Sequence, residues 1–223
     1  MKRYLFMSLL LCMAQAQSAI QIESSRIIYS GSSNSASVKI NNISTENYIV
    51  QSWLDKGTDK GGEKPPLVVT PPLVKLKPEQ SAILRFIYSG NGLPVDRESI
   101  FWLNVQEVPP KSKQENVLQL AIRTRLKLFY RPPQVKNTLV DVVKKMSWQI
   151  KDNQLLIKND GPLHITLISV AVADKNGKVS PVNIPMVSPF STLVVPVAGK
   201  TRVVKMNYIN DYGAVVAIQP ATK

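Results

Sequence analysis

Short segments that resemble β-strands recur along almost the whole chain, and this recurrence restricts the possible folds more than any other feature. The segments are rich in Val, Ile and aromatic residues, as in YIVQSWLD at 48–55 and SIFWLNVQEV at 99–108. Turn residues separate them, for example in NNISTEN and DKGTDKGGEKPP. Regular spacing of this kind predicts an all-β sandwich rather than alternating strands and helices.

The same pattern begins again after the Pro-Pro pair at 132–133, so we expect two domains in series. We place their boundary within residues 133–141, which gives domains at 20–136 and 137–223. In the second domain, Asn176-Gly177 is a strong hairpin signal. No sustained helical periodicity is visible. The sequence therefore predicts two β-sandwiches, each with its own apolar core.

Proline and tryptophan positions refine this prediction. Pro-Pro pairs occur at 65–66, 71–72, 109–110 and 132–133. Proline cannot donate a backbone hydrogen bond, so these pairs should lie outside central strands and mark sheet edges or crossings between sheets. Trp53 lies where an immunoglobulin-like sandwich often buries a tryptophan, and Trp102 and Trp148 also lie in core-like segments.

The first 19 residues predict export. Lys2 and Arg3 precede the apolar run YLFMSLLLCM and then the small residues of AQAQSA. This order is typical of a secretory signal peptide, which we expect to be cleaved after Ala16, with Ala19 as the alternative. The only cysteine, Cys12, lies in this segment. The exported chain should therefore lack an intrachain disulfide and depend on its apolar cores.

Composition and motifs indicate neither a nucleic-acid-binding protein nor an enzyme. Lys and Arg number 28 against 15 Asp and Glu, but export makes nucleic acid a poor partner, and a partner with carboxylates suits the charge better. His164, inside a predicted strand, is the only histidine, and no metal or cofactor motif occurs. Catalysis by paired carboxylates would require two acidic side chains to converge in space. The spacing of the candidates in the sequence does not favour such convergence; they are Asp96, Glu98, Glu107 and Asp211. An enzyme is therefore the weaker hypothesis, and we expect no cofactor.

The segment VLQLAIRTRLKLFYRPP at 117–133 is unusual for a surface strand. Its even positions from Leu118 to Tyr130 are nearly all apolar, and its odd positions are largely basic. Alternate side chains of a strand point to opposite sides, so the segment predicts one long strand with an apolar face and a cationic face. A strand of this length that ends at Pro-Pro invites pairing with another chain.

Four motifs in a fixed order are more specific. The chain contains IQIESSRIIYSG at 20–31, LPVDRESIFWLNVQEVPP at 93–110, NVLQLAIRTRLKLFYRPP at 116–133 and YINDYG at 208–213. Together they resemble the periplasmic pilus (fimbrial) chaperones of the chaperone–usher pathway. The resemblance covers nearly the whole chain after the signal peptide, and agreement of several long motifs in order makes chance a poor explanation.

This resemblance implies a boomerang of two immunoglobulin-like domains that binds pilus subunits in the periplasm. Such a subunit is an incomplete sandwich; the chaperone lends it a strand and later delivers it to an outer-membrane usher. The family's groove-filling positions fall on Leu118, Leu120 and Ile122. We expect these side chains to be accessible in the free chain and buried in the complex. An exposed edge strand is tolerable when donating it is the function.

The resemblance also assigns roles to charged residues. The lysine that grips the subunit's terminal carboxylate falls on Lys127, and its arginine partner falls on Arg26. Two convergent cations form a sound carboxylate site. Glu98, Arg131 and Asp211 fall on an ion network that bridges the two domains and fixes their angle.

Other functions stay open at this point. The alternatives are an exported pilus subunit or adhesin, or an exported carbohydrate-binding β-sandwich. A subunit is usually one incomplete domain with a disulfide, and a carbohydrate-binding module would expose aromatic residues on one face. The short, cysteine-free segment between Pro109 and Val117 places the chain in the short-loop branch of the chaperones. A dimer in which free molecules cap each other's strand is also compatible with the sequence.

Overall fold

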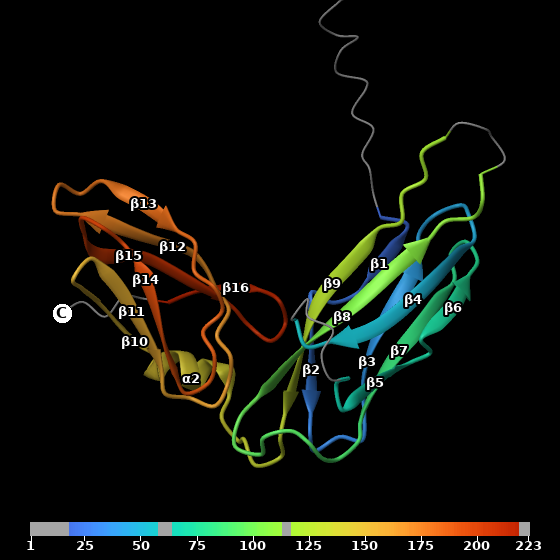
Figure 1. Cartoon of the computed structure of the whole chain (residues 1–223), viewed down its shortest axis with the longest axis horizontal. Coiled ribbons are helices and arrows are strands. Elements are labelled where there is room, and N and C mark those ends of the chain that lie inside the picture. The colour runs from blue at the N-terminus through green and yellow to red at the C-terminus, as the bar shows by residue number, and fades with distance from the viewer. Residues whose placement is uncertain (1–17, 58–63, 113–116, 219–223) are drawn as a thin grey trace, which may run out of the picture.

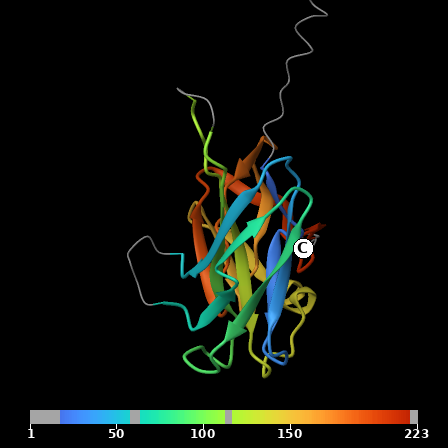
Figure 2. The same cartoon turned by 90° about the vertical axis from the view of Figure 1, so that its right-hand side faces the viewer.

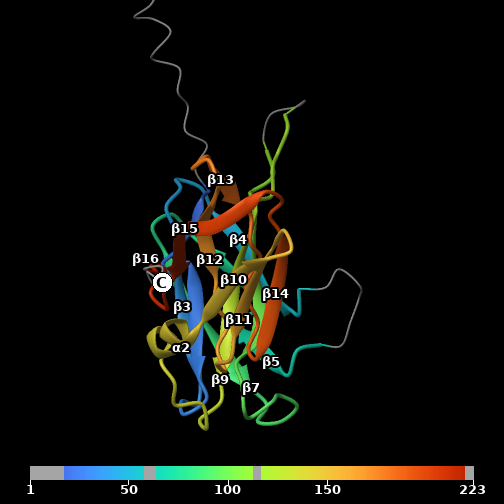
Figure 3. The same ribbon diagram turned by 90° about the vertical axis from the view of Figure 1, so that its left-hand side faces the viewer.

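The chain forms two β-sandwiches, and the predicted all-β fold class is confirmed. The computed structural model describes residues 18–57, 64–112 and 117–218. The two sandwiches stand at an angle to each other and meet at one end of each (Figure 1). In the views from either side, one sandwich lies behind the other (Figure 2 and Figure 3). Residues 1–17, which contain the favoured cleavage site of the predicted signal peptide after Ala16, lie outside the described residues, whereas the alternative site after Ala19 lies within them.

The N-terminal sandwich consists of a four-stranded and a five-stranded sheet. The first sheet contains, in spatial order, β1 Ile20–Ile22, β3 Ala36–Asn42, β7 Ser81–Tyr88 and β5 Leu67–Thr70. The second contains β2 Arg26–Ser30, β9 Arg123–Arg131, β8 Ser99–Val108, β4 Tyr48–Asp55 and β6 Leu73–Leu76. Strand β2 runs parallel to β9, whereas β8 pairs with β9 in the antiparallel sense. The side chains fully buried between the sheets include Ile40, Leu84, Phe86, Leu103 and Leu128.

The C-terminal sandwich consists of a three-stranded and a four-stranded sheet. The first contains β10 Ser147–Lys151, β11 Gln154–Asn159 and β14 Ser191–Pro196. The second contains β13 Val179–Val182, β12 Leu167–Asp174, β15 Lys200–Ile209 and β16 Val215–Ala217. Its core includes Leu155, Ile157, Leu163, Ile165 and Met206. This second, separate core is what the restart of the strand pattern predicts.

Turn and proline signals are confirmed at the level of single residues. Asn176-Gly177 lies in the hairpin between β12 and β13, and Gly177 has a φ of +83°. The Pro-Pro pair at 71–72 separates β5 from β6, which belong to opposite sheets. The pairs at 109–110 and 132–133 lie outside the strands, as predicted, but they directly follow the ends of the interior strands β8 and β9 and so mark strand ends rather than sheet edges. Proline acts at each of these places by ending the ladder of backbone hydrogen bonds.

Helix α2, Leu139–Lys145, is an element that the strand patterns did not predict. Its seven residues make only about two turns, too few for a helical period to stand out. The signal that was available is a capping box, because the Thr138 side chain accepts from the Asp141 backbone N–H and Asp141 accepts from Thr138. The helix buries Leu139, Val142 and Val143 in the C-terminal core.

The three tryptophans are half-buried rather than fully buried, which corrects the expectation that they lie in the cores. Trp148 packs against the C-terminal core. Trp53 pairs with Asn104 on the outer side of the five-stranded sheet, because Val50 and Ser52 occupy the alternate, buried positions of β4. The alternation of β4, which is visible in the sequence, decides where Trp53 lies, and the general position of a tryptophan in immunoglobulin sandwiches does not.

The predicted long strand is shorter than expected. Strand β9 begins at Arg123, so Val117–Ile122 form no strand in the free chain. The neighbouring strand β8 ends at Val108, and Pro109 and Pro110 cannot continue the ladder. A single backbone bond from Glu107 N to Ile122 O, 3.0 Å, extends the pairing beyond Arg123. The segment before Arg123 lacks the neighbours that would hold it in a sheet.

Candidate functional site

Strand β9 lies between β2 and β8, and its odd positions point away from the core. Lys127 pairs with Arg26 of β2 on one side and with Trp102 of β8 on the other. Side chains of directly paired residues project on the same side of a sheet. The register therefore brings the two predicted carboxylate-binding cations, Arg26 and Lys127, together on the outer side of the five-stranded sheet.

The positive charges of Arg26 and Lys127 repel each other, and each disfavours the protonated form of the other. Burial lowers the pKa of Lys127, and the positive charge of Arg26 lowers it further. Burial also lowers the pKa of Arg26, against the attraction of Asp211 and Glu98. Both shifts mean that the positive charges are less well solvated here than in water. An anion placed between these side chains would stabilise both charges.

Arg26 is only 9% exposed and has an unused donor. Its Nη1 donates to the Ile209 carbonyl oxygen of the C-terminal domain, 3.2 Å away. Its buried Nε has no hydrogen-bond partner within the described residues. A buried donor without a partner is unfavourable, so the site would gain from an acceptor supplied by another molecule.

Trp102, which belongs to the motif at 93–110, forms a platform beneath Arg125 and Lys127, a role that the motif did not indicate. Its ring lies 4.5 Å from the Arg125 guanidinium carbon and 5.7 Å from Lys127 Nζ. Asp55 fixes Arg125 through a 2.7 Å ion pair and accepts from Asn104 Nδ2 at 2.6 Å. Cations over an indole ring are held by its negative face. The signal lay in strand register, which one sequence does not give.

The predicted groove-filling side chains are strongly exposed. Leu118 is 86% exposed, Leu120 68% and Ile122 41%. Farther along the same alternation, Leu126 and Leu128 are buried in the N-terminal core. The expectation that the first three are accessible in the free chain is confirmed, and their burial by a partner stays a prediction.

The predicted interdomain network is present with close contacts. Arg131 Nε donates to Glu98 at 2.7 Å, and its two terminal nitrogens donate to Asp211 at 2.7 and 2.6 Å. Burial opposes the charge of Arg131, but its hydrogen bonds to Asp211 and the charge of Glu98 outweigh burial and raise its pKa. Arg131 and Glu98 belong to the N-terminal sandwich, whereas Asp211 follows β15 in the C-terminal one.

His164 completes this network, and the prediction that it lies inside a strand is wrong. His164 precedes β12. The chain next to it forms only an isolated bridge, between Ile165 and Val187, and no strand. Its backbone N and its Nδ1 lie 2.8 and 2.9 Å from the second oxygen of Glu98. The ring also packs against Phe129, with centroids 5.7 Å apart. A structural role for this histidine agrees with its position between the domains.

The YINDYG motif folds so that Asp211 reaches Arg131. The Asn210 side-chain oxygen accepts from the backbone N–H groups of Tyr212 and Ala214, at 3.0 and 2.9 Å. Gly213 has a φ of +85°, and a side chain there would collide with Ser25 of the other domain. The motif is therefore a turn whose side chains and close approach join the two sandwiches.

Two other kinds of site are not found in the described residues. No group of three or more His, Cys, Asp or Glu side chains there is placed to hold a metal ion. No helix in the described part of the chain has the length and apolar character needed to cross a membrane.

Both halves of the chain match one family. Residues 19–136 match the family described as "Pili and flagellar-assembly chaperone, PapD N-terminal domain", and residues 141–219 match "Pili assembly chaperone PapD, C-terminal domain". The chain belongs to this family of pilus-assembly chaperones, which are binding proteins and not enzymes.

Individual relatives agree with this assignment. The chain is 36% identical over 214 residues to a probable fimbrial chaperone, LpfB, of Escherichia coli O157:H7, and the match covers 94% of this chain and 91% of the relative. It is 37% identical to the chaperone LpfB of Salmonella typhimurium, over 87% of this chain and 84% of that protein. A solved Salmonella enterica SafA pilin–SafB chaperone complex matches with a TM-score of 0.79 and 29% identity, covering 91% and 95% of the two chains. These matches support neither a pilus subunit nor a carbohydrate-binding module.

Proposed function

We propose that this chaperone acts in the periplasm, where it stabilises pilus subunits by donating Val117–Ile122 to them and then delivers them to an outer-membrane usher. The observation that carries the proposal is one continuous segment with two properties. Its exposed half presents Leu118, Leu120 and Ile122 in strand alternation. Its paired half carries Lys127 beside Arg26, within reach of a common anion. The SafA–SafB complex supports a pilus subunit as the partner.

In this mechanism the two cations set the register of the client strand. A terminal carboxylate held by Arg26 and Lys127 fixes one end of that strand by charge-assisted hydrogen bonds. Ile122 lies five positions before Lys127, which corresponds to roughly 16 Å of extended chain. The client strand can then pair with the exposed segment while the apolar side chains fill its groove. A register error of one residue would turn these side chains to the wrong side.

The interdomain network has a structural role in this proposal. Glu98, Arg131 and Asp211, together with His164, hold the two sandwiches at one angle, so that both can approach one client. We retain the division into domains at 20–136 and 137–223, preceded by a signal peptide cleaved after Ala16 or Ala19. Free molecules that cap each other's Val117–Ile122 would form a dimer, detectable as a concentration-dependent mass in sedimentation.

The test is complex formation between the purified protein and pilus subunits of the same cell. We expect a one-to-one complex in size-exclusion chromatography with light scattering. A peptide with the sequence of a client's last strand and a free terminal carboxylate should bind more tightly than its amidated form. Equal binding of the two peptides would exclude the carboxylate anchor while leaving strand donation intact. Failure of every pilus protein to form a complex would exclude the proposed function.

A further inference from the structure

A large cavity opens in the C-terminal sandwich, away from the cationic site of β9. Its volume is about 840 Å³. It lies between helix α2, strand β10 and the pair β15–β16, elements that are labelled in Figure 3. Within the described part of the chain, β10 pairs only with β11 and β16 pairs only with β15. The cavity therefore opens between two sheet edges. Its size is within the usual range for small-molecule sites, roughly 300–1,000 Å³.

The walls of the cavity are mostly apolar and incompletely covered, with Ser147, Gln149 and Thr201 among the polar residues that line it. Trp148, Ile150, Val203, Val216 and Ile218 all line it, and each packs against the core while staying half-buried. The apolar side chains around it extend to helix α2, where Val140 is 47% exposed. A cavity lined mainly by apolar side chains, with a few polar groups, is the usual form of a small-molecule site.

The charges around the cavity have one sign. Lys144 of α2 and Arg202 of β15 are the charged residues that line it within the described chain, and no Asp or Glu lines it. Both side chains are exposed, and neither forms an ion pair with a described residue. An apolar cavity with two cations at its opening is complementary to a molecule with a long apolar chain and a negative end.

We propose that this cavity binds a single long-chain fatty acid, with its acyl chain against Trp148 and Val203 and its carboxylate at Lys144 and Arg202. The inference is independent of the proposed client site, because it uses different residues in the other domain. A peptide strand paired with the free edge of β10 is the competing occupant. The absence of acidic lining and the large apolar walls favour the acyl chain, because a peptide strand would bring polar backbone into contact with those walls.

The experiment titrates the purified protein with decanoate, dodecanoate and tetradecanoate below their micelle concentrations, by calorimetry. We expect one site, with an affinity that rises roughly four-fold for each added methylene. Dodecyltrimethylammonium, with the same chain and the opposite charge, should bind at least ten-fold more weakly. Acetate should not bind. Equal affinity for the two amphiphiles, or no dependence on chain length, would overturn the proposal.

Matched variants locate the site. Lys144→Gln/Arg202→Gln should weaken dodecanoate binding ten-fold or more. Lys145→Gln/Lys205→Gln removes the same charge from the same two elements outside the cavity, and it should change affinity less than two-fold. Trp148→Phe should abolish the change in tryptophan fluorescence on binding, whereas Trp53→Phe should retain it. Equal loss in both double variants would show only general charge attraction and reject the site.

A peptide occupant gives a different result. Binding that is insensitive to acyl length but is matched by an extended acidic peptide would assign the cavity to strand pairing and overturn the fatty-acid proposal. Loss of client capture is not expected in any of these variants, because Lys144 and Arg202 lie outside the β9 site. The two proposals can therefore fail separately.

Discussion

One segment of the chain has two halves, Val117–Ile122 and Arg123–Arg131. Both halves alternate apolar and polar residues, but only the second half lies between neighbouring strands. In the second half Leu126 and Leu128 are buried, whereas Leu118 and Leu120 in the first half are mostly exposed. The second half has β2 on one edge and β8 on the other. The first half has neither neighbour, because β2 begins at Arg26, opposite Lys127, and β8 ends at Val108.

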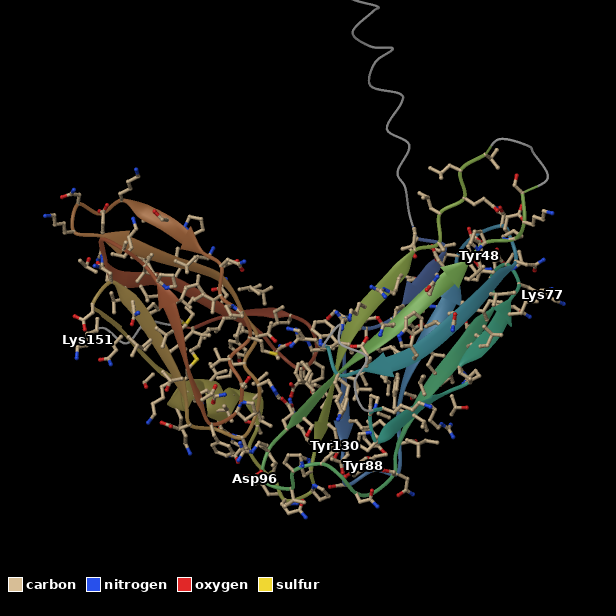
Figure 4. All side chains as sticks on the ribbon, viewed as in Figure 1. Tyr48, Lys77, Tyr88, Asp96, Tyr130 and Lys151 are labelled. Carbon is tan, nitrogen blue, oxygen red and sulfur yellow. The ribbon has the colours of Figure 1, made fainter. Side chains whose placement is uncertain are left out.

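This comparison separates two causes that usually act together. Alternation decides which side chains are apolar, and neighbouring strands decide whether those side chains are buried. The exposed half thus has the alternation of a strand but no neighbouring strand in the free chain, and in the proposed function a pilus subunit supplies that neighbour. Tyr130, near the end of the paired half, packs against Tyr88 at the lower end of the sandwich (Figure 4), with ring centroids 4.5 Å apart.

The largest effect should come from a charge in the exposed half. Leu120→Asp should weaken client binding at least a thousand-fold, because a carboxylate buried in the client groove lacks a partner. The melting temperature should stay within about 2 °C of the unmodified protein, since Leu120 is mostly exposed in the free chain. Ala121→Asp, on the opposite face, is the matched control and should weaken client binding far less. Comparable losses in pull-downs with the two variants would argue against strand donation.

Substitutions in the paired half, Arg123–Arg131, should affect the stability of the fold, unlike substitutions in the exposed half. Leu128 is fully buried, so Leu128→Ala should lower the free energy of unfolding by about 2–5 kcal/mol. Leu120→Ala removes the same atoms from the exposed half and should change it by less than about 0.5 kcal/mol. Urea denaturation measures both. Similar destabilisation by the two variants would mean that residues 117–122 pack against the free protein after all.

Much of this arrangement follows from the sequence. Most strands lie where alternation and turn residues place them, and β4 and β8 have the predicted bounds. The cationic pair and the interdomain network followed from motif resemblance, because Asp211 and Arg131 are 80 residues apart and spacing alone does not join them.

The remaining features depend on register and tertiary contact. The Trp102 platform needs β4, β8 and β9 to be aligned. The start of β9 depends on where β8 stops, and His164 meets Glu98 across 66 residues. None of these contacts between distant residues produces a periodic pattern in the local sequence. The platform was therefore not predicted, the strand was predicted too long, and the histidine was placed in the wrong element.

Lys127 tests whether the paired half also binds. Lys127→Ala should weaken client binding by about 2–5 kcal/mol, because the client carboxylate keeps only Arg26 as a partner. The unfolding free energy should hardly change, since Lys127 projects from the outer side of the sheet. Competition calorimetry with a free-carboxylate peptide measures the loss, and the amidated peptide is the control. Wild-type affinity in Lys127→Ala would remove the anchor from the mechanism.

Trp102 should have a smaller effect on the same site. Trp102→Leu removes the aromatic face under Lys127 and Arg125 and should weaken client binding by about 0.5–2 kcal/mol. Trp102→Phe retains part of that face and should recover about half of the loss. Trp53→Leu, on the neighbouring strand of the same side, is the control. A loss in Trp102→Leu that Phe does not reduce would indicate packing rather than cation–π attraction.

The pH dependence of client binding should be the smallest and most specific effect. Burial and the charge of Arg26 lower the pKa of Lys127 below its ordinary 10.5, so its charge is lost at a lower pH than that of an ordinary lysine. A bound carboxylate favours the charged form, so binding takes up a proton in this range and affinity should fall with rising pH, by up to about ten-fold per pH unit. Lys127→Arg keeps its charge in this range and should give a flatter profile. Parallel profiles for the two proteins would show that Lys127 does not contact the carboxylate.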